Sequence, residues 1–161
     1  MTVTTRRAGP LDARPMAELL NEIIEVGGTT AMTEPVSRED LMRWMEADPR
    51  SIWHVAEDPA GEILGFQWIA PHRDHGAQVG QIATFAKHGK TGLGIGTKLF
   101  EATKEAARVA GYAWINAEIR ADNEGGLIYY QSRGFEDYGR VEGQLMANGQ
   151  VVDKVLKRYD L

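Results

Sequence analysis

Apolar side chains recur along the chain with two different periods, and each period predicts a different kind of element. After Asp12, which can cap a helix, they return every three or four residues and so mark one face of an amphipathic helix. Its apolar positions are Met16, Leu19, Leu20, Ile23 and Ile24. Gly27 and Gly28 are expected to end this helix, and Ser37 with Asp40 resembles the capping box that opens a second one.

Elsewhere the apolar residues alternate with polar ones or form short runs, which is typical of β-strands. The predicted strands cover Val3–Arg6, Ile52–Glu57, Ile63–Ala70, Ala77–Ala86, Trp114–Arg120, Phe135–Val141 and Val151–Arg158. Asp58–Gly61 has the composition of a turn and joins two of them in a hairpin, whereas Pro71–Gly76 is expected to be a polar loop. Two more helices are predicted, a short one over Gly125–Arg133 and a longer one that Gly111 ends. The buried face of the longer helix is expected to carry Ile95, Leu99, Ala102, Ala106 and Val109.

The order of these elements mixes hairpins with crossovers. It predicts an α/β fold built on a single mixed, mostly antiparallel sheet of about seven strands, with helices on both faces. No linker or internal repeat divides the 161 residues, so residues 1–161 are expected to form a single domain. A chain of this length can bury a full core without a disulfide or a metal.

Composition and charge exclude several classes of protein. The formal net charge of −5 argues against nucleic acid as a bulk partner, because that requires a basic face. The lack of cysteine excludes a disulfide scaffold, a cysteine nucleophile and a zinc site built on thiolates, and it fits a reducing cytoplasm. No stretch approaches the roughly 18 apolar residues of a membrane span. We therefore expect a cytoplasmic protein with no nucleic acid and no membrane as partners.

Glycine supplies the first candidate chemistry. Six of the 18 glycines lie between residues 76 and 96, and they culminate in a glycine- and lysine-rich loop between a predicted strand and a predicted helix. Glycines bring backbone N–H groups close to an anion, and the start of a helix adds free donors and partial positive charge. The segment predicts a phosphate or pyrophosphate cradle, with Lys87, Lys90 and Lys98 nearby. The alternative is a flexible turn that binds nothing. Neither a Walker A loop nor a Rossmann fingerprint fits, because Thr97-Lys98 follows Gly96.

Two segments resemble the GNAT superfamily of N-acetyltransferases. Thr91-Gly92-Leu93-Gly94-Ile95-Gly96 is similar to its acetyl-CoA signature Q/R-x-x-G-x-G/A, although Thr91 replaces the first residue. Asn123, then Tyr130, then Gly134-Phe135 is similar to its N-x₆-Y-x₃-G-F stretch. The resemblance implies that Asn123 contacts the pantetheine arm and that Tyr130 protonates the departing thiolate. A phenol with a pKa of about 10 can do this. The alternative for Tyr130 is an aromatic residue that only packs on the sheet.

Further likeness points to the phosphinothricin acetyltransferase-like branch, carried by Ile24-Glu25, Thr29-Thr30, Thr33-Glu34-Pro35 and Gly149–Asp153. It implies a homodimer that uses acetyl-CoA, without a metal, to acetylate the primary amine of a small amino-acid-like acceptor. The implied cofactor contacts are Thr84, Phe85, Ala86, Thr91, Gly92, Leu93, Gly94, Ile95, Gly96, Thr97, Asn123 and Tyr130. The implied acceptor contacts are Glu25, Thr30, Met32, His72, His75 and Phe85.

The group that removes the proton from the acceptor stays open. An alkylammonium must lose a proton before it attacks a thioester, and the branch often has a glutamate on the fourth strand. Gln81 stands at that position and cannot take a proton at neutral pH. Catalytic candidates besides Tyr130 and Gln81 are Glu25, Glu118, His72 and His75. Glu118 shares a strand face with Asn116 and Arg120, so an ion pair is its alternative role. His72 and His75 lack a third ligand, so no metal site is expected.

Two other functions stay compatible with the sequence. One is a CoA-binding module that has lost catalysis, which the departures at Thr91 and Gln81 suggest. The other is an acetyltransferase acting on a protein, polyamine or aminoglycoside amine.

Overall fold

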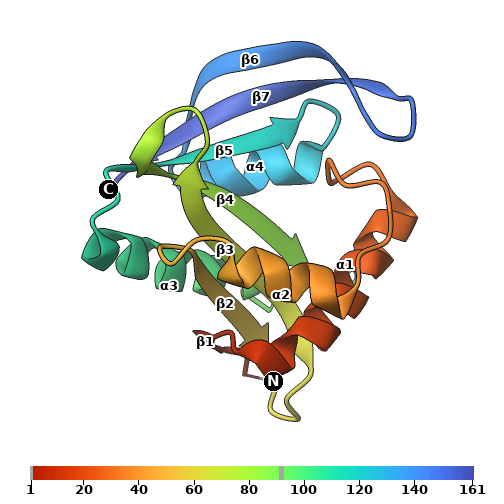
Figure 1. The fold of residues 1–161 in the computed structure, drawn as a ribbon, viewed down its shortest axis with the longest axis vertical. Coiled ribbons are helices and arrows are strands. Elements are labelled where there is room, and N and C mark those ends of the chain that lie inside the picture. The colour runs from red at the N-terminus through yellow and green to blue at the C-terminus, as the bar shows by residue number, and fades with distance from the viewer. Residues whose placement is uncertain (1, 91–92) are drawn as a thin grey trace.

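The computed structural model describes residues 2–90 and 93–161, and within them the chain forms one seven-stranded sheet (Figure 1). The strands are β1 (Thr4–Arg7), β2 (Ile52–Glu57), β3 (Ile63–His72), β4 (Gly76–Ala86), β5 (Trp114–Arg120), β6 (Glu136–Leu145) and β7 (Val151–Asp160). Their order across the sheet is β1-β2-β3-β4-β5-β7-β6. Neighbours pair antiparallel except β4 and β5, which are parallel. The predicted mixed, mostly antiparallel sheet is therefore confirmed.

Helices cover both faces of this sheet. They are α1 (Ala13–Val26), α2 (Arg38–Glu46), α3 (Ile95–Ala110) and α4 (Glu124–Ser132). Helices α1 and α2 pack on one face, in a core that includes Trp53, Phe66 and Phe85, whereas α3 and α4 cover the other (Figure 1). The capping box predicted at Ser37 is present, because the backbone N–H groups of Ser37 and Asp40 each donate to the other residue's side chain.

The buried face of α3 differs from the prediction. The residues that face the sheet are Ile95, Leu99, Phe100, Thr103 and Ala107, whereas Val109 is 82% exposed. The observed face follows the i, i+4 row that starts at Ile95, and it includes a polar residue, Thr103. A prediction that counts only apolar residues leaves out the buried Thr103. It therefore selects positions that turn progressively away from the sheet, and Val109 was wrongly assigned to the buried face.

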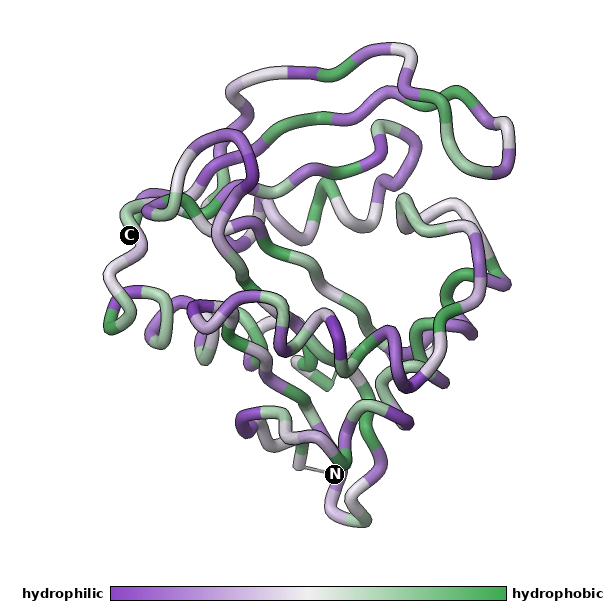
Figure 2. Tube along the Cα trace, viewed as in Figure 1, coloured by the Kyte–Doolittle hydropathy of each residue, from purple (hydrophilic) through white to green (hydrophobic). Residues whose placement is uncertain are grey.

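Three strands, β3, β6 and β7, end two or more residues beyond their predicted ends, and β7 continues from Arg158 to Asp160. β3 continues through Pro71 to His72, so the predicted loop shortens to residues 73–75. The pairing register shifts between Pro71 and His72, and such an irregularity tolerates a residue without an N–H donor. β6 continues to Leu145 although every one of its residues is exposed, so its sequence carries no alternation that would mark the full strand. Figure 2 shows apolar positions along the central strands and a mixture of hydrophilic and apolar positions along the outer strands β6 and β7.

The sheet forks between β4 and β5. These two strands pair only at Val79 with Trp114, Gly80 with Ile115, and Gln81 with Asn116, and they diverge beyond that point. Gly80 allows the close packing at the base of the fork, because a Cβ there would lie 2.2 Å from the Ile69 Cδ1 atom. The second half of β4 therefore has one edge turned toward β5 but not paired with it. Among the described residues, no helix is both long and apolar enough to cross a membrane.

Candidate functional site

A cleft of about 1210 Å³ opens at the fork. Its walls come from the diverging ends of β4 and β5, the segment Thr29–Met32 after α1, and the first turns of α3 and α4. Side chains alternate along β4, so Phe85 joins the core beneath α1 whereas Ile82 joins the core beneath α3 and α4. Because β4 and β5 are not paired at the fork, a molecule bound on one face of the sheet can contact a molecule bound on the other face.

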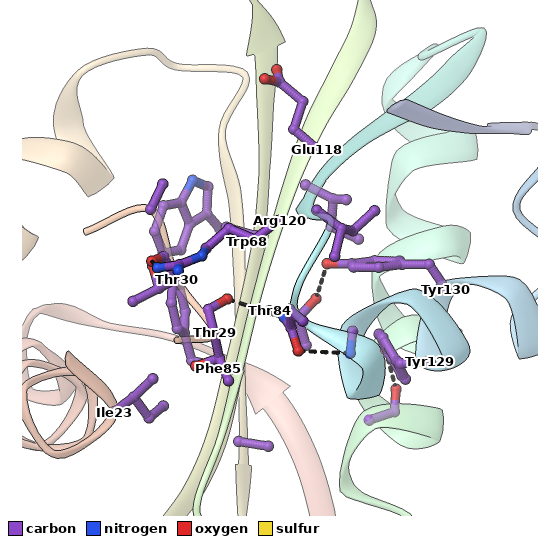
Figure 3. A pocket seen from close by; sticks show the side chains of 18 of the residues that line it. Ile23, Thr29, Thr30, Trp68, Thr84, Phe85, Glu118, Arg120, Tyr129 and Tyr130 are labelled. Atoms are coloured by element: carbon purple, nitrogen blue, oxygen red, sulfur yellow. Dashed lines mark hydrogen bonds between the residues drawn. The ribbon is translucent and has the colours of Figure 1, made fainter. Parts of the chain in front are cut away.

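Tyr130 lies on the α4 side of this fork, where a chain of hydrogen bonds fixes its hydroxyl. The Tyr130 hydroxyl lies 2.7 Å from the Thr84 hydroxyl (Figure 3). Gln67 Nε2 donates to the Thr84 hydroxyl over 2.9 Å and to the Tyr129 hydroxyl over 3.1 Å. The Tyr129 hydroxyl in turn donates to the Gly96 carbonyl over 2.7 Å. Two neighbouring tyrosines therefore connect the middle of β4 with the start of α3.

Burial keeps both phenols protonated. It raises the pKa of Tyr130 well above the ordinary value, and the hydrogen bond with Thr84 opposes this only in part. Burial likewise raises the pKa of Tyr129 to about 12. The two hydroxyls differ in their partners, because that of Tyr129 is committed to a carbonyl whereas that of Tyr130 contacts a hydroxyl that can donate or accept. Tyr130 is therefore the better-placed proton donor at the cleft.

The end of the cleft near α3 is basic and suited to an anion. Gly94 caps α3 with a positive φ of 72°, and the first helical bond runs from Lys98 N to the Gly94 carbonyl. The N–H groups before Lys98 precede the helical ladder and form a donor set. Lys87, Lys90 and Arg133 line this end of the cleft. Lys98 turns elsewhere, because its ammonium donates to the Val3 carbonyl over 2.6 Å.

Gly96 has a packing reason to be glycine. A Cβ on Gly96 would lie 2.6 Å from the Tyr129 Cε1 atom, which is closer than real contacts allow. The aromatic ring therefore needs the missing side chain in order to pack on the first turn of α3. The glycine-rich segment thus combines two roles, which are close packing of Tyr129 and an open helix start.

The opposite end of the cleft combines an apolar wall with charged groups. Trp68 and Phe85 stack with their ring centroids 5.5 Å apart, on the opposite side of β4 from Tyr130 (Figure 3). Arg120 is buried, forms two hydrogen bonds with the Asp122 carboxylate at 2.9 and 3.0 Å, and donates to the Thr30 carbonyl over 3.3 Å.

Lys154 lies directly opposite Arg120 in the pairing of β5 with β7 and is only 9% exposed. Both cations line the cleft. Within residues 2–90 and 93–161, no ion pair or hydrogen bond engages the Lys154 ammonium.

The candidates for proton removal have distinct surroundings. Gln81 Oε1 accepts from Asn116 Nδ2 over 2.6 Å, so the amide is held in place at the base of the fork. His72 Nδ1 accepts from the backbone N–H groups of Asp74 and His75, at 2.9 and 3.1 Å. Its Nε2 atom faces the Glu118 carboxylate at 3.7 Å. Arg120 pairs with Asp122, so the alternative ion pair with Glu118 is not formed.

The cleft gathers most, but not all, of the residues singled out in the sequence. Those that line it are Thr30, Met32, His72, Gln81, Thr84, Phe85, Ala86, Gly94, Ile95, Gly96, Thr97, Glu118, Asn123 and Tyr130. Glu25, His75 and Leu93 are not among the lining residues, and Thr91 and Gly92 lie outside the described residues. Glu25 is exposed, whereas the His75 ring packs at a tilt against that of His72, with 4.3 Å between the ring centroids.

Asn123 has local partners in this structure. Its Oδ1 atom accepts from Gly126 N over 3.0 Å and caps α4, and its Nδ2 atom donates to the Thr29 carbonyl over 3.1 Å. The residue thereby ties the segment after α1 to the start of α4.

Sequence patterns did not single out Trp68, Arg120 and Lys154 as site residues, because each fits an ordinary strand position. No cluster of three metal-ligating side chains occurs in the described part of the chain.

Comparisons with known proteins agree with this architecture. A family model described as the acetyltransferase (GNAT) family matches residues 16–135. YwnH of Bacillus subtilis, provisionally named a phosphinothricin acetyltransferase, is 27% identical over 164 residues, which is 99% of this chain and 95% of the relative.

Solved structures share the fold at low sequence identity. A GNAT superfamily phosphinothricin acetyltransferase from Sinorhizobium meliloti, crystallised with acetyl-CoA, superposes with a TM-score of 0.89 at 21% identity over 100% of this chain and 89% of that one. An N-acetyltransferase from Staphylococcus aureus superposes with a TM-score of 0.88 at 21% identity over 99% of both chains.

Proposed function

Because the chain belongs to the GNAT family of acetyltransferases, we propose that it moves the acetyl group of acetyl-CoA directly to the primary amine of a small, amino-acid-like acceptor. The observation that carries this proposal is the forked cleft, in which a buried and hydrogen-bonded Tyr130 lies between a basic end and an end with an apolar wall. Bound acetyl-CoA would supply an activated thioester at the fork.

The residues at the basic end fit the phosphate groups of CoA. The first turn of α3 offers backbone donors, and Lys90 and Arg133 add full positive charge. Arg133 Nη1 donates to the Thr97 hydroxyl over 2.6 Å, whereas its Nε atom is buried without a hydrogen-bond partner in the described residues. The unpaired edge of β4 offers further backbone groups to an extended arm, as a strand edge does for a peptide.

Tyr130 would hold the proton that the departing sulfur requires. Its raised pKa keeps the phenol protonated while the substrates bind, so that a proton is present when the thiolate forms beside it. A backbone N–H of β4 near Phe85 would stabilise the negative charge on the acetyl oxygen. Holding the two reactants together in the cleft removes the cost of a bimolecular encounter. Because the chain has no cysteine, no acetyl-cysteine intermediate can form, and the acetyl group would pass directly to the amine.

The charges at the other end of the cleft support an acceptor that bears an anionic group besides its amine. Lys154 lies beside Arg120 across β5 and β7 and lines the cleft, and Asp122 already pairs with Arg120, so Lys154 is the cation of this pair without an ion-pair partner among the described residues. A carboxylate or phosphinate on the acceptor would pair with the Lys154 ammonium. Trp68 and Phe85 would contact its apolar part.

A thiol-release assay with acetyl-CoA and a panel of amines tests this function. The panel contains amino acids, phosphinothricin, methionine sulfoximine, polyamines and decarboxylated analogues of the amino acids. We expect release with an anionic acceptor and at least tenfold less with its decarboxylated analogue. Lys154→Met should raise KM for the anionic acceptor and leave KM for acetyl-CoA unchanged. Thermal stabilisation by ATP or NAD but not by acetyl-CoA would contradict the assignment.

A second candidate is a CoA-binding module without catalysis. The observation that favours it is Gln81, an amide fixed by Asn116 at the position where a proton acceptor is expected. Binding of acetyl-CoA without thiol release for any amine of the panel would support this candidate.

We also propose that the protein forms a homodimer through β6. This strand is one of the two edges of the sheet and is exposed along its whole length, and unprotected edges tend to pair. Leu145 and Val151, which pair across β6 and β7, are 71% and 65% exposed. Light scattering after size-exclusion chromatography should give twice the chain mass for the wild type and a single chain for Leu145→Lys. A monomeric wild type would contradict this proposal.

A further inference from the structure

Gln67 on β3 is a buried polar residue to which the proposed function assigns no role. Its side chain is fully buried, and its neighbours Phe66 and Trp68 pack in the core beneath α1 and α2. Because side chains alternate along a strand, Gln67 turns to the opposite face of the sheet, where α3 and α4 pack. We propose that Gln67 is a positioning residue that directs the hydroxyl hydrogen of Tyr130 into the cleft, an inference that rests on the proposed acetyltransferase function.

The register of the sheet places Gln67 beside the site. It pairs directly with Thr84 on β4. The Gln67 Nε2 atom donates to the Thr84 hydroxyl over 2.9 Å, and that hydroxyl lies 2.7 Å from the hydroxyl of Tyr130 (Figure 3). Two hydrogen bonds therefore connect the Gln67 amide with the proposed proton donor.

The Gly96 carbonyl determines which atom of the Gln67 amide faces the two hydroxyls. A carbonyl oxygen can only accept, so the single hydroxyl hydrogen of Tyr129 is used in the 2.7 Å bond to Gly96. The Tyr129 oxygen can then only accept from Gln67, and the amide must present its Nε2 atom, which lies 3.1 Å away. If the amide oxygen faced Tyr129 instead, two acceptors would meet. The orientation of the amide therefore follows from a fixed backbone group.

The same reasoning gives the direction of the next two hydrogen bonds. The two hydrogens of the Gln67 amide nitrogen go to Tyr129 and Thr84, so the Thr84 hydroxyl accepts at this contact. Among the residues that the structure describes, the Tyr130 oxygen is the acceptor that lies within reach of the remaining Thr84 hydrogen. Thr84 therefore donates to Tyr130, and the hydroxyl hydrogen of Tyr130 is left free to point into the cleft.

An unpartnered atom indicates that the amide serves its neighbours. The Oε1 atom of Gln67 is buried and has no hydrogen-bond partner within residues 2–90 and 93–161. A buried acceptor without a partner destabilises a fold, whereas an apolar side chain of the same length would not. A glutamine at this position is therefore explained by its two N–H donors, which hold Thr84 and Tyr129.

The titratable groups around Gln67 are neutral near pH 7. His54 pairs directly with Gln67 on β2, and burial lowers the pKa of its ring to about 4. On the α4 side, burial raises the pKa of Tyr129 to about 12 and likewise raises that of Tyr130. Beyond His54, the next strand carries Arg7, which is exposed. Hydrogen bonds between neutral groups therefore set the direction of the chain.

This direction matters when the sulfur leaves. For a neutral amine, the nitrogen electron pair forms the bond to the acetyl carbon, and the carbon–sulfur bond breaks with its electrons left on sulfur. Tyr130 gives its hydrogen to the sulfur, and its phenolate oxygen keeps the hydrogen bond that Thr84 donates. The phenol regains a proton from the N–H that the attacking nitrogen loses, so one amide and one thiol are formed. If Tyr130 instead donated to Thr84, it would have to break that bond first.

Gln67→Met removes both N–H donors and keeps the length of the side chain. Thr84 can then accept from Tyr130, so kcat with the most active amine of the panel should fall about tenfold in the thiol-release assay. The Kd for acetyl-CoA should stay within twofold, which also shows that the variant is folded. Thr103→Val, which changes another buried polar side chain beneath α3, is the matched control and should keep the wild-type kcat.

A double variant separates this role from a merely structural one. Because Gln67 acts through Thr84, Gln67→Met combined with Thr84→Val should be at most twofold slower than Thr84→Val alone. A general disturbance of the core would slow both backgrounds equally. Gln67→Met with the wild-type kcat, or a full tenfold loss in the Thr84→Val background, overturns the inference.

Neutron diffraction from crystals of the deuterium-exchanged wild type gives the direction of the chain without any variant. The Thr84 deuterium should lie on the line to the Tyr130 oxygen, and the Tyr130 deuterium should lie on the cleft side. A Tyr130 deuterium on the line to Thr84, or a Gln67 oxygen that faces Thr84, overturns the inference. Failure of the wild type to acetylate any amine instead contradicts the proposed function, and the deuterium positions test the chain independently of it.

Discussion

Thr84→Val removes one hydroxyl at the centre of the site and should weaken both the fold and the reaction. The hydroxyl lies 2.7 Å from that of Tyr130 and 2.9 Å from Gln67 Nε2. The valine side chain has nearly the same shape, so the packing around it is preserved. Tyr130 is left with a buried hydroxyl without this partner, and Gln67, whose Oε1 atom is already unpartnered in the described residues, keeps only Tyr129.

The magnitude follows from the burial of these groups. A buried polar group that loses its partner costs about 1–3 kcal/mol. The methyl group that replaces the hydroxyl returns about 0.8 kcal/mol through apolar burial. The free energy of unfolding should therefore fall by up to about 2 kcal/mol, which corresponds to a Tm lower by up to roughly 8 °C. One hydrogen bond of about 1–1.5 kcal/mol also aims the Tyr130 phenol, so kcat should fall about tenfold.

Urea unfolding and thiol release measure the two effects, with Thr84→Ser as the control that keeps the hydroxyl. Combining Thr84→Val with Tyr130→Phe should cost less stability than the sum of the single changes, because both remove the same hydrogen bond. Unchanged stability of Thr84→Val, or strictly additive losses in the double variant, would refute the proposed hydrogen-bonded link between β4 and α4.

Three further predictions concern other parts of the molecule. Tyr130→Phe should lower kcat at least 100-fold in the thiol-release assay while the Kd for acetyl-CoA stays within twofold, and unchanged turnover would remove the phenol from the mechanism. Gly96→Ala should lower the free energy of unfolding by about 1–3 kcal/mol and weaken acetyl-CoA binding, because its Cβ would lie 2.6 Å from the Tyr129 ring; equal stability in urea would contradict this packing. Asp12→Asn should lower the free energy of unfolding by about 1–3 kcal/mol at pH 7, because hydrogen bonds from Arg6 and the Gly9 N–H stabilise the Asp12 carboxylate and hold its pKa below the ordinary 3.8. That stabilisation is present above pH 3.8 and is lost as the pH falls through the lower pKa of the folded state, so the Tm difference from the wild type should vanish in acid.

Local signals in the sequence were sufficient for most elements of the fold. Gly27 and Gly111 cap α1 and α3 at their C-terminal ends with positive φ, as their positions after apolar stretches indicated. The capping box at Ser37 was readable because it depends on residues three apart. The face of α3 was assigned wrongly because a buried threonine interrupts its apolar row.

The geometry of the site could be foreseen only in part. The resemblance to a known family brought Gly94, Gly96 and Tyr130 into one hypothesis, and all three line one cleft. The divergence of β4 from β5 has no local signal, because both strands look continuous in the sequence. The hydrogen bond between Thr84 and Tyr130 also has no local signal, because it joins residues 46 positions apart and depends on how α4 packs.

Pairing across the sheet hides a second group of residues. Arg120 and Lys154 are neighbours only through the register of β5 with β7, and each fits an exposed or ion-paired strand position when considered alone. Likewise, the sequence alone does not show that Arg120 pairs with Asp122 and not with Glu118.

Mass spectrometry of a reaction with isotopically labelled acetyl-CoA tests the central claim most directly. The measurement compares three amounts, which are the labelled acetyl group on the amine, the labelled acetyl group on the protein, and the free thiol. Direct transfer predicts one acetylated amine for each thiol released and no acetylated form of the protein during turnover. Thiol release without acetylated amine, or label that passes through the protein on its way to the amine, would contradict the account.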